Sequence, residues 1–344
     1  MSPESSNQHP GPDPETSSGS GILRGPGDPG SSPAAIPRKG YLYVGGAATL
    51  WAVSGSSGKF LFQSGVTPYE LVQIRVTLAS LCLLAWFLLR NPRLIPVARQ
   101  DILYFMVLGI CGMAMVQFTY FYAISKIHVA VAILLEYLAP TFIALYSVVV
   151  LRERLTRLTV IAVAGSTVGC YLAVGAYNLN LLSMNLEGIL AGIASAIAFA
   201  WYAIHGERGM RRYDPWTVLF HALLYAAILW NIALSPFHAF MRSYSPVQWG
   251  WILYISILGT AVPFGLYLEG INLIRSTRAS VTATLEPIMA GFISYFFLGE
   301  TLQSLQLLGG GIVLASVITL QSRKEFDANT PALIRERHKS RFRR

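Results

Sequence analysis

Charged residues are scarce in this chain, and their scarcity excludes a soluble globule. Asp, Glu, Lys and Arg make up 12% of its 344 residues, whereas hydrophobic residues make up 53%. The mean hydropathy is +0.50. The polar side chains are too few to cover the surface of a water-soluble domain of this length. We therefore expect the apolar runs to lie in a lipid bilayer.

Catalytic and cofactor motifs are also missing. The sequence contains no HExxH, CxxC, GxGxxG, Walker A or GxSxG pattern, which removes the common nucleophile, metal and nucleotide arrangements. Its three cysteines, Cys82, Cys111 and Cys170, lie in apolar runs, where a thiol behaves as a small apolar group. We therefore expect no enzyme, no cofactor, no metal site and no disulfide framework.

Long apolar runs are present instead, and each is about as long as a membrane-spanning helix. A hydrocarbon core roughly 30 Å thick needs about 20 helical residues. The expected fold class is an all-α integral membrane protein with ten transmembrane helices. The runs cover residues 41–62, 69–89, 102–123, 129–151, 158–176, 186–205, 216–236, 247–270, 279–298 and 304–321.

The first five runs and the second five repeat one another. A shift of 147 positions places Pro140 on Pro287. The same shift places Glu153 on Glu300, Tyr120 on Tyr267, Gly112 on Gly259, Ile124 on Ile271 and Leu155 on Leu302. Because each half has an odd number of spans, the second half is expected to insert upside down relative to the first. Inverted repeats of this kind form the substrate path of many transporters.

Basic residues predict the orientation of the spans, because Lys and Arg in short loops stay on the cytoplasmic side. With the N-terminus in the cytoplasm, 22 of the 26 Lys and Arg residues lie in cytoplasmic loops and tails. Both termini of a plasma (inner) membrane protein are therefore expected to be cytoplasmic. The net charge of +9 follows from this topology, and since no aromatic residues interleave the basic ones, nucleic acid is not expected as a partner.

The chain is expected to divide into two helical repeats and two tails. Residues 41–176 form the first five-helix repeat and residues 186–321 the second. Residues 1–38 are rich in Pro, Gly and Ser and lack the apolar core of a secretory signal peptide, so a disordered cytoplasmic tail is expected. Residues 322–344 form a basic cytoplasmic tail, which either is solvated or contacts anionic lipid.

Two carboxylates stand beside prolines, deep in apolar helices. Glu136 lies one turn before Pro140, and Glu286 immediately precedes Pro287. A charge at that depth costs on the order of 2.5–3.5 kcal/mol, so it is rarely accidental. Each carboxylate either binds a cationic part of a substrate, relays a proton, pairs with a buried base or makes a structural hydrogen bond. The prolines are expected to bend their helices, either beside a cavity or for packing alone.

Other polar and aromatic residues are weaker candidates. Arg75 is expected to extend its side chain to the membrane interface. Lys59 follows the small-residue run SGSSG and is a candidate counter-charge for a carboxylate across a cavity. Trp51 and Trp201 occupy similar places in the two halves, at an offset of 150. Such aromatic faces either line a cavity for a ring-bearing or cationic substrate or serve interior packing.

The segments that follow the two prolines resemble a known family. LRERLT follows Pro140, and LGETLQ follows Pro287 with LLGGGIVLASV behind it. Together with ten spans in two halves, they are similar to EamA-type members of the drug/metabolite transporter superfamily over roughly residues 41–321. The resemblance implies two inverted five-helix repeats around a central cavity. It also implies a small metabolite as substrate, often an amino acid moved outward.

The resemblance also supplies expectations for single residues. Glu153 and Glu300 are expected at helix ends, where each orders a turn. Cavity-forming helices carry the expected substrate-binding residues Trp51, Tyr120, Glu136, Trp201, Tyr267 and Glu286.

The expected function is secondary transport of a small metabolite, most simply its export, by alternating access to a mid-membrane cavity. Proton coupling through Glu136 or Glu286 is a further hypothesis. The alternatives are an intramembrane enzyme, which needs a nucleophile beside a base or a metal set, and a lipid-handling scaffold. A passive channel needs a continuous polar lining, and the spans contain too few polar residues for one.

Overall fold

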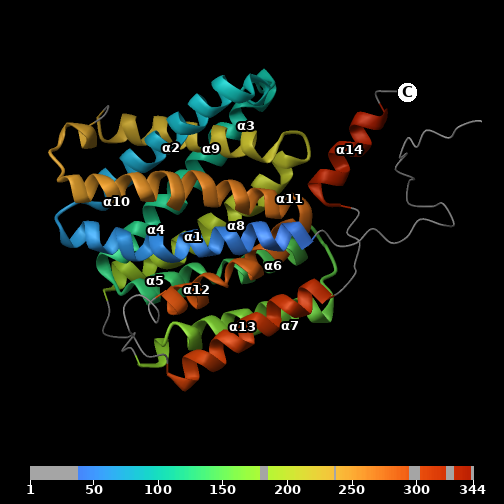
Figure 1. Ribbon diagram of the computed structural model, residues 1–344. Coiled ribbons are helices and arrows are strands. Elements are labelled where there is room, and N and C mark those ends of the chain that lie inside the picture. Colours follow the sequence, from blue (N-terminus) through green and yellow to red (C-terminus); the bar gives the residue numbers. More distant parts are fainter. Residues whose placement is uncertain (1–37, 179–184, 236–237, 294–302, 323–328, 342–344) are drawn as a thin grey trace, which may run out of the picture. The chain divides into compact units, whose positions relative to one another are not determined.

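Helices are the regular structure of the part of the chain that the computed structural model describes, residues 38–178, 185–235, 238–293, 303–322 and 329–341 (Figure 1). The first repeat contains α1 (Arg38–Gln63), α2 (Pro68–Arg90), α3 (Ile102–Val107), α4 (Met115–Lys126), α5 (Val129–Glu136), α6 (Ala139–Val149) and α7 (Arg157–Ala173). The second contains α8 (Leu186–Met210), α9 (Pro215–Ala233), α10 (Pro246–Ser256), α11 (Val262–Ala283), α12 (Glu286–Ile293) and α13 (Ser304–Ser322), and α14 (Pro331–Arg341) follows.

Seven helical stretches of the described chain are long and apolar enough to cross a bilayer. They are Pro68–Arg90, Arg99–Lys126, Val129–Val149, Leu186–Met210, Pro215–Ala233, Pro246–Ala283 and Ser304–Gln321. The all-helical, multi-pass character expected from the sequence is confirmed. Helices α1 and α7 lie outside this set, α7 because it has only 17 residues, and the last residues of the ninth expected span lie outside the described chain. The number of ten spans therefore stays a prediction.

Polar caps determine where several helices begin. Thr67 and Glu70 form a capping box at the start of α2, and Ser245 and Gln248 form another at the start of α10. Asp214 caps α9 through its side-chain oxygen. Each cap satisfies an amide that no helix carbonyl reaches, which matters most at the edge of an apolar phase.

The two repeats correspond in their helix boundaries and in their packing. The 147-residue shift carries Pro68, the first residue of α2, onto Pro215, the first residue of α9. Helix α1 packs on α11, and the equivalent helices of the other repeat, α8 and α4, also pack on each other (Figure 1). Helix α2 packs on its own equivalent α9, and α7 packs on its own equivalent α13. The two-repeat architecture expected from the duplication is therefore confirmed.

Two π-helical segments occupy equivalent places in the repeats. Segment Leu108–Ala114 (η3) joins α3 to α4, and segment Ile257–Ala261 (η7) joins α10 to α11. The shift of 147 places Ala114 on Ala261, so both segments end at the same position of the repeat. A π-helical turn leaves the regular hydrogen-bond ladder and is frequent at functional sites.

The prolines mark breaks in two helices rather than bends within them. Tyr137 and Leu138 separate α5 from α6, and the equivalent residues Thr284 and Leu285 separate α11 from α12. Pro140 and Pro287 are the second residues of the helices that follow, where a missing N–H breaks no helix hydrogen bond. At each predicted kink the helix is therefore interrupted just before the proline.

A third irregularity separates the eighth and ninth expected spans. Arg275 has φ 67° and ψ 164° inside the stretch assigned to α11, so the helix ends at Ile274 and a new one starts at Ser276. A side chain in this backbone region costs on the order of 1–3 kcal/mol, so the surroundings must hold it. The equivalent position of the first repeat is His128, which precedes α5.

The C-terminal tail contains a docked helix. Helix α14 contacts α8 and α11, and the Arg335 guanidinium donates through Nη1 to the carbonyls of Met210 and Tyr213 at 2.5 and 2.7 Å. Arg335 therefore caps the C-terminal end of α8. Part of the expected basic tail therefore contacts the helices of the second repeat.

Helices α7 and α13 meet along glycines, among them Gly169 of α7 and Gly309 of α13. A Cβ at Gly309 would lie 2.4 Å from the Ala173 amide nitrogen and 2.7 Å from the Gly169 carbonyl oxygen. By contrast, a Cβ at Gly311 would meet nothing within 4 Å. The two backbones touch, and only a residue without a side chain permits that distance.

Replacing Gly309 by alanine is expected to separate α7 from α13, because the new methyl group meets backbone atoms that cannot move aside. We expect a loss of about 1–3 kcal/mol in stability, measured as a lower midpoint of thermal unfolding in detergent. Gly311→Ala is the matched control and should be neutral or stabilising, since alanine is the better helix former. Equal midpoints for both variants would contradict the glycine contact.

Candidate substrate cavity

A cavity lies among helices of both repeats. The first repeat contributes Trp51, Ser54, Arg75, Val116, Gln117, Tyr120, Phe121, Glu136 and Tyr137, and the second contributes Phe199, Phe264 and Glu286. The lining combines aromatic rings with one guanidinium and two carboxyl groups.

Four of the six residues expected at the site line this cavity. They are Trp51, Tyr120, Glu136 and Glu286. Tyr267 lies behind the wall: its side chain is fully buried, and its ring centroid lies 5.5 Å from that of Trp51. It therefore supports a cavity residue without lining the space itself.

Trp201 lies elsewhere. Its ring stacks on His205, with centroids 3.9 Å apart and planes 19° from parallel, and it is not among the residues that line the cavity. The offset of 150 between Trp51 and Trp201 explains this, because the repeats superpose at 147. The residue equivalent to Trp201 is Ser54, which does line the cavity.

The helix breaks bring both carboxyl groups to the cavity. Glu136 is the last residue of α5 and Glu286 the first of α12, so the two acids stand on opposite sides of equivalent breaks. The Ser195 hydroxyl donates to Glu136 at 3.2 Å, and the Tyr137 hydroxyl donates to Glu286 at 2.7 Å. Each carboxyl group therefore has one neutral hydrogen-bond donor from the protein.

Arg75 corrects the sequence analysis. The prediction that its side chain extends to the interface is wrong, because only 2% of the residue is exposed and it lines the cavity. Its Nε and Nη2 donate to the Thr260 hydroxyl at 2.9 and 2.7 Å, and Nη2 also donates to the Gly259 carbonyl at 3.2 Å. The guanidinium carbon lies 4.4 Å from the centroid of the Phe121 ring. Segment η7 thus supplies acceptors that sequence periodicity does not reveal.

Lys59 has a different role from the counter-charge expected of it. Its Nζ donates to the carbonyls of Ile124 and Ile127 at 2.7 and 3.2 Å, and it is not among the residues that line the cavity. These carbonyls lie at the C-terminal end of α4, where a cation is stabilised by the helix dipole. The cation beside the carboxylates is Arg75.

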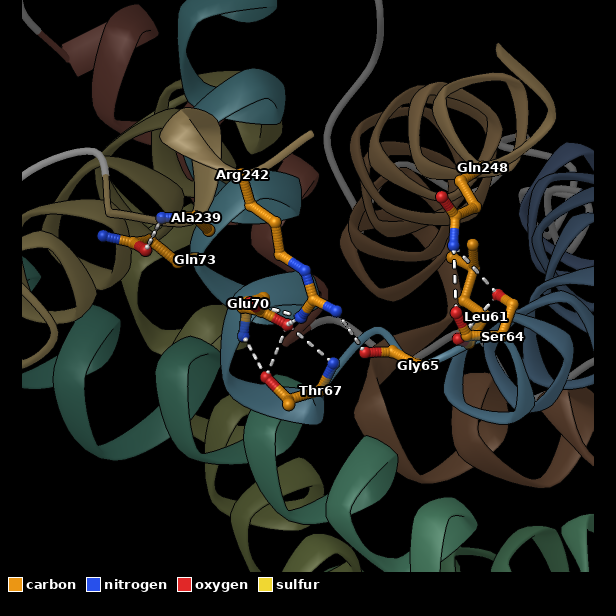
Figure 2. Close-up of polar contacts among 9 residues, drawn as sticks. All are labelled: Leu61, Ser64, Gly65, Thr67, Glu70, Gln73, Ala239, Arg242 and Gln248. Atoms are coloured by element: carbon orange, nitrogen blue, oxygen red, sulfur yellow. Dashed lines mark hydrogen bonds and ion pairs between the residues drawn. The ribbon is translucent and has the colours of Figure 1, made fainter. Parts of the chain in front are cut away.

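One end of the helix bundle, which we call the Arg242 end, carries the α1–α2 and α9–α10 connections. There Arg242 donates to both Glu70 carboxylate oxygens at 2.8 Å and to the Gly65 carbonyl at 2.9 Å, while Gln248 donates to the Ser64 carbonyl at 3.1 Å (Figure 2). The hydrogen bonds from Arg242 to Glu70 raise the pKa of Arg242. Because Gly65 and Glu70 belong to the first repeat and Arg242 and Gln248 to the second, these contacts join the repeats.

The opposite end, which we call the Arg275 end, also joins the repeats. Arg275 donates to Glu153 of the first repeat at 2.7 Å and to Glu207 of its own repeat at 2.9 Å. Glu207 also accepts from the amide and hydroxyl of Ser276 at 2.8 and 2.6 Å. The side chains of Arg275 and Glu207 are 16% and 5% exposed, against 45% for Arg242. Arg275 is therefore more deeply buried than Arg242, whereas Glu153 is more exposed than Glu70, at 30% against 11%. The bonds of Arg275 offset its unfavourable backbone.

The predicted turn residues of the two repeats have different outcomes. Glu153 does lie in the connection between α6 and α7, where its amide donates to the Ser147 carbonyl at 2.9 Å, and it also pairs with Arg275. Glu300 lies outside the described residues. Within the described chain, no group of three or more His, Cys, Asp or Glu residues has an arrangement that could hold a metal ion.

The described chain is thus a two-repeat helical membrane protein with a central charged cavity, an arrangement that many transporters share. Residues 38–175 and again 186–321 match the EamA-like transporter family, and the chain belongs to this family. The family membership inferred from the sequence is thereby confirmed, and the protein is a multi-pass membrane transporter with a small-molecule substrate.

Several relatives share most of their length with this chain. An uncharacterized inner membrane transporter, YicL, of Salmonella typhimurium strain LT2 is 30% identical over 295 residues, which cover 83% of this chain and 97% of YicL. The threonine/homoserine exporter RhtA of Escherichia coli strain K12 is 25% identical over 254 residues, which cover 73% of this chain and 82% of RhtA. A solved crystal structure with 20% identity and a TM-score of 0.65, covering 82% of this chain and 96% of its own, shows the shared fold alone.

Proposed function

We propose that the protein exports a small polar metabolite, such as an amino acid, across the plasma (inner) membrane by alternating access to the cavity. The observation that carries this proposal is the cavity itself, because a guanidinium, two carboxyl groups and aromatic walls meet in the membrane-spanning part of both repeats. Buried ionisable groups at this depth mark substrate or ion pathways. The relative RhtA is named a threonine/homoserine exporter, which favours outward movement of an amino acid.

Alternating access requires that each end of the bundle open in turn. The contacts between repeats at the Arg242 end and at the Arg275 end are built from ion pairs and hydrogen bonds that can break and re-form, whereas a continuous apolar seam would resist opening. The positive-inside rule predicts that the Arg275 end faces the cytoplasm. In this proposal, breaking the Glu153–Arg275 pair admits substrate from the cytoplasm, and breaking the Glu70–Arg242 pair releases it outside.

Export is tested by comparing metabolites inside and outside cells that carry or lack the protein. We expect at least one small polar metabolite to accumulate outside the cells that express it, and purified protein in proteoliposomes to move that metabolite. A protein in which Arg75, Glu136 and Glu286 are all replaced by Met controls for leakage. Equal metabolite profiles in both cell lines, with no flux in proteoliposomes, would refute transport.

Proton coupling through the cavity carboxyl groups is tested by Glu136→Gln and Glu286→Gln. Glutamine keeps the shape and hydrogen-bonding capacity of the side chain but cannot gain or lose a proton. We expect at least one variant to lose the dependence of flux on an imposed pH gradient, measured in proteoliposomes. Glu187→Gln, which alters an exposed pair with Lys126, is the control. Full flux with an unchanged pH profile in both cavity variants would exclude coupling through these residues.

Opening at the Arg275 end is tested by Glu153→Gln, which removes the ionic contact between repeats. A partly buried pair is worth about 1 kcal/mol, so the open state should gain roughly five-fold in population. The readout is labelling of a thiol introduced by Val116→Cys, in a chain without its three native cysteines, by an impermeant reagent. Labelling should rise in inside-out vesicles, and a rise only in right-side-out vesicles would reverse the assigned orientation.

A further inference from the structure

The Arg75 guanidinium is buried but incompletely paired. Its Nη1 has no hydrogen-bond acceptor among the described residues, although Nε and Nη2 are both engaged. A buried charge is strongly unfavourable unless its hydrogen bonds are satisfied, and Arg75 is 2% exposed and lines the cavity. An N–H donor is therefore left for an acceptor that enters the cavity.

Three hydrogen bonds to η7 hold the Arg75 guanidinium in one position. The Thr260 hydroxyl donates its own proton to the Ile255 carbonyl at 2.7 Å, so its oxygen is oriented to accept from Nε and Nη2. The Gly259 carbonyl, from the same π-helical segment η7, accepts a further bond. A donor fixed on one side by three hydrogen bonds loses little freedom when a ligand binds the other side.

This arrangement exists in one repeat only. The shift of 147 places Arg75 on Ala222 and Thr260 on Met113. Neither replacement residue has a charge or a hydroxyl group, so the duplication did not preserve a second guanidinium site. The cavity lining is therefore asymmetric, because its single guanidinium extends from α2 and is hydrogen-bonded by η7.

The carboxyl groups complete a separation of charge within the cavity. Neither Glu136 nor Glu286 forms an ion pair with Arg75 within 4.0 Å, because the ion pairs among the described residues all lie elsewhere. Their protein partners are the neutral hydroxyls of Ser195 and Tyr137. The Arg75 guanidinium and both carboxyl groups thus line one cavity, and Arg75 and Glu136 act on each other electrostatically without forming an ion pair.

We infer that the cavity recognises a zwitterion, with the ligand's carboxylate bound by the Arg75 guanidinium and its ammonium group facing Glu136 and Glu286. This inference rests on the proposed transport function and names its substrate class. A planar guanidinium matches the geometry of a carboxylate better than an ammonium group does. The rings of Trp51 and Phe264, with centroids 5.0 Å apart, and that of Phe199 supply an apolar wall for the remainder of the ligand.

Ligands with a single charge fit this cavity less well. A carboxylic acid without an amine would satisfy Arg75 but would approach two carboxyl groups. An amine without a carboxylate would satisfy the acids but leave the Arg75 Nη1 donor unpaired. Since a site built to bond a polar group discriminates strongly against an analogue that lacks it, Arg75 is the specificity-determining residue.

The first experiment uses the unmodified protein in detergent. Thermal unfolding is measured with each of the twenty standard L-amino acids. For every stabilising amino acid, dissociation constants are then measured for it, for its decarboxylated amine and for its deaminated acid. We expect the amino acid to bind about 10- to 100-fold more tightly than either analogue, the factor for one charge-assisted pairing. An amine that binds as tightly as its parent amino acid would overturn the inference.

The second experiment uses Arg75→Gln. The amino acid should lose about 10- to 100-fold in affinity while the amine keeps its own, so the ratio of the two affinities falls toward one. A purely structural role would weaken both ligands equally. Arg75→Lys, which keeps the charge without the planar fork, should give an intermediate ratio, and Lys59→Met is the control that removes a cation outside the cavity.

A third variant keeps the inference testable when Arg75→Gln fails to fold. Thr260→Val leaves the guanidinium in place but removes the hydroxyl that holds it, and the affinity ratio should fall by several-fold. An unchanged ratio in folded Thr260→Val and Arg75→Lys proteins would overturn the role of Arg75.

The failure of this inference is distinguishable from the failure of transport. Cells that export a metabolite without both an amine and a carboxylate would refute the zwitterion and leave the transporter intact. No export from cells, together with no binding by any of the twenty amino acids, would refute the proposed function itself. Export of an amino acid by a protein whose Arg75→Gln variant keeps the wild-type affinity ratio would refute Arg75 alone.

Discussion

Backbone groups inside a bilayer must be hydrogen-bonded by the protein itself, and this constraint explains where the chain departs from regular helix. Lipid offers no donors or acceptors, so irregular backbone is tolerated only where protein or a polar cavity covers it. The chain has π-helical segments at η3 and η7 and helix breaks before Pro140 and Pro287. Residues on or beside η7 and both breaks line the cavity or bond a residue that does. Irregular backbone at η7 and at the two breaks is therefore covered by the cavity, and it supplies polar groups to the cavity in turn.

Duplication supplies the scaffold, and the differences between the copies supply the chemistry. Equivalent positions hold Arg75 and Ala222, or Glu136 and Ala283, and in each pair only one member has an ionisable side chain. Glu286 likewise corresponds to Ala139. A symmetric cavity would place like charges opposite each other at a high cost, whereas these substitutions give one cation and two acids. The symmetry of the helices and the asymmetry of the lining thus serve separate purposes.

Much of the fold follows from patterns that the sequence states directly. The 147-residue shift and the apolar runs predicted the helices, the two repeats and the interruptions at the prolines, because these depend on local periodicity and on residues that exclude a helix hydrogen bond. The depth of Glu136 and Glu286 in apolar runs identified both acids that line the cavity. Such features are encoded within one helix, so no knowledge of the neighbouring helix was needed.

The errors concern residues whose role depends on another helix. Arg75 was assigned to the interface because a long cation near a helix end usually reaches water, but the acceptors at Gly259 and Thr260 lie 184 and 185 residues away in the sequence. Trp201 was paired with Trp51 by similarity of residue type, although the superposition requires an offset of 147. A π-helical segment has no sequence pattern of its own here, so the acceptor that fixes Arg75 was not predictable from periodicity.

The charge of the ligand also decides which forces act on transport. A membrane potential of 100 mV does about 2.3 kcal/mol of work on each elementary charge that crosses. A zwitterion carries no net charge, so the potential neither drives nor opposes its own movement. The direction of transport then depends on the concentration gradient of the ligand and on any ion that moves with it. A cavity with two carboxyl groups and one guanidinium holds one acid more than the cation neutralises, and a single proton on Glu136 or Glu286 would leave the unoccupied cavity electrically neutral. The ammonium group of the ligand and the proton would thus act on the same two carboxyl groups, which permits their movements to be coupled through Glu136 and Glu286.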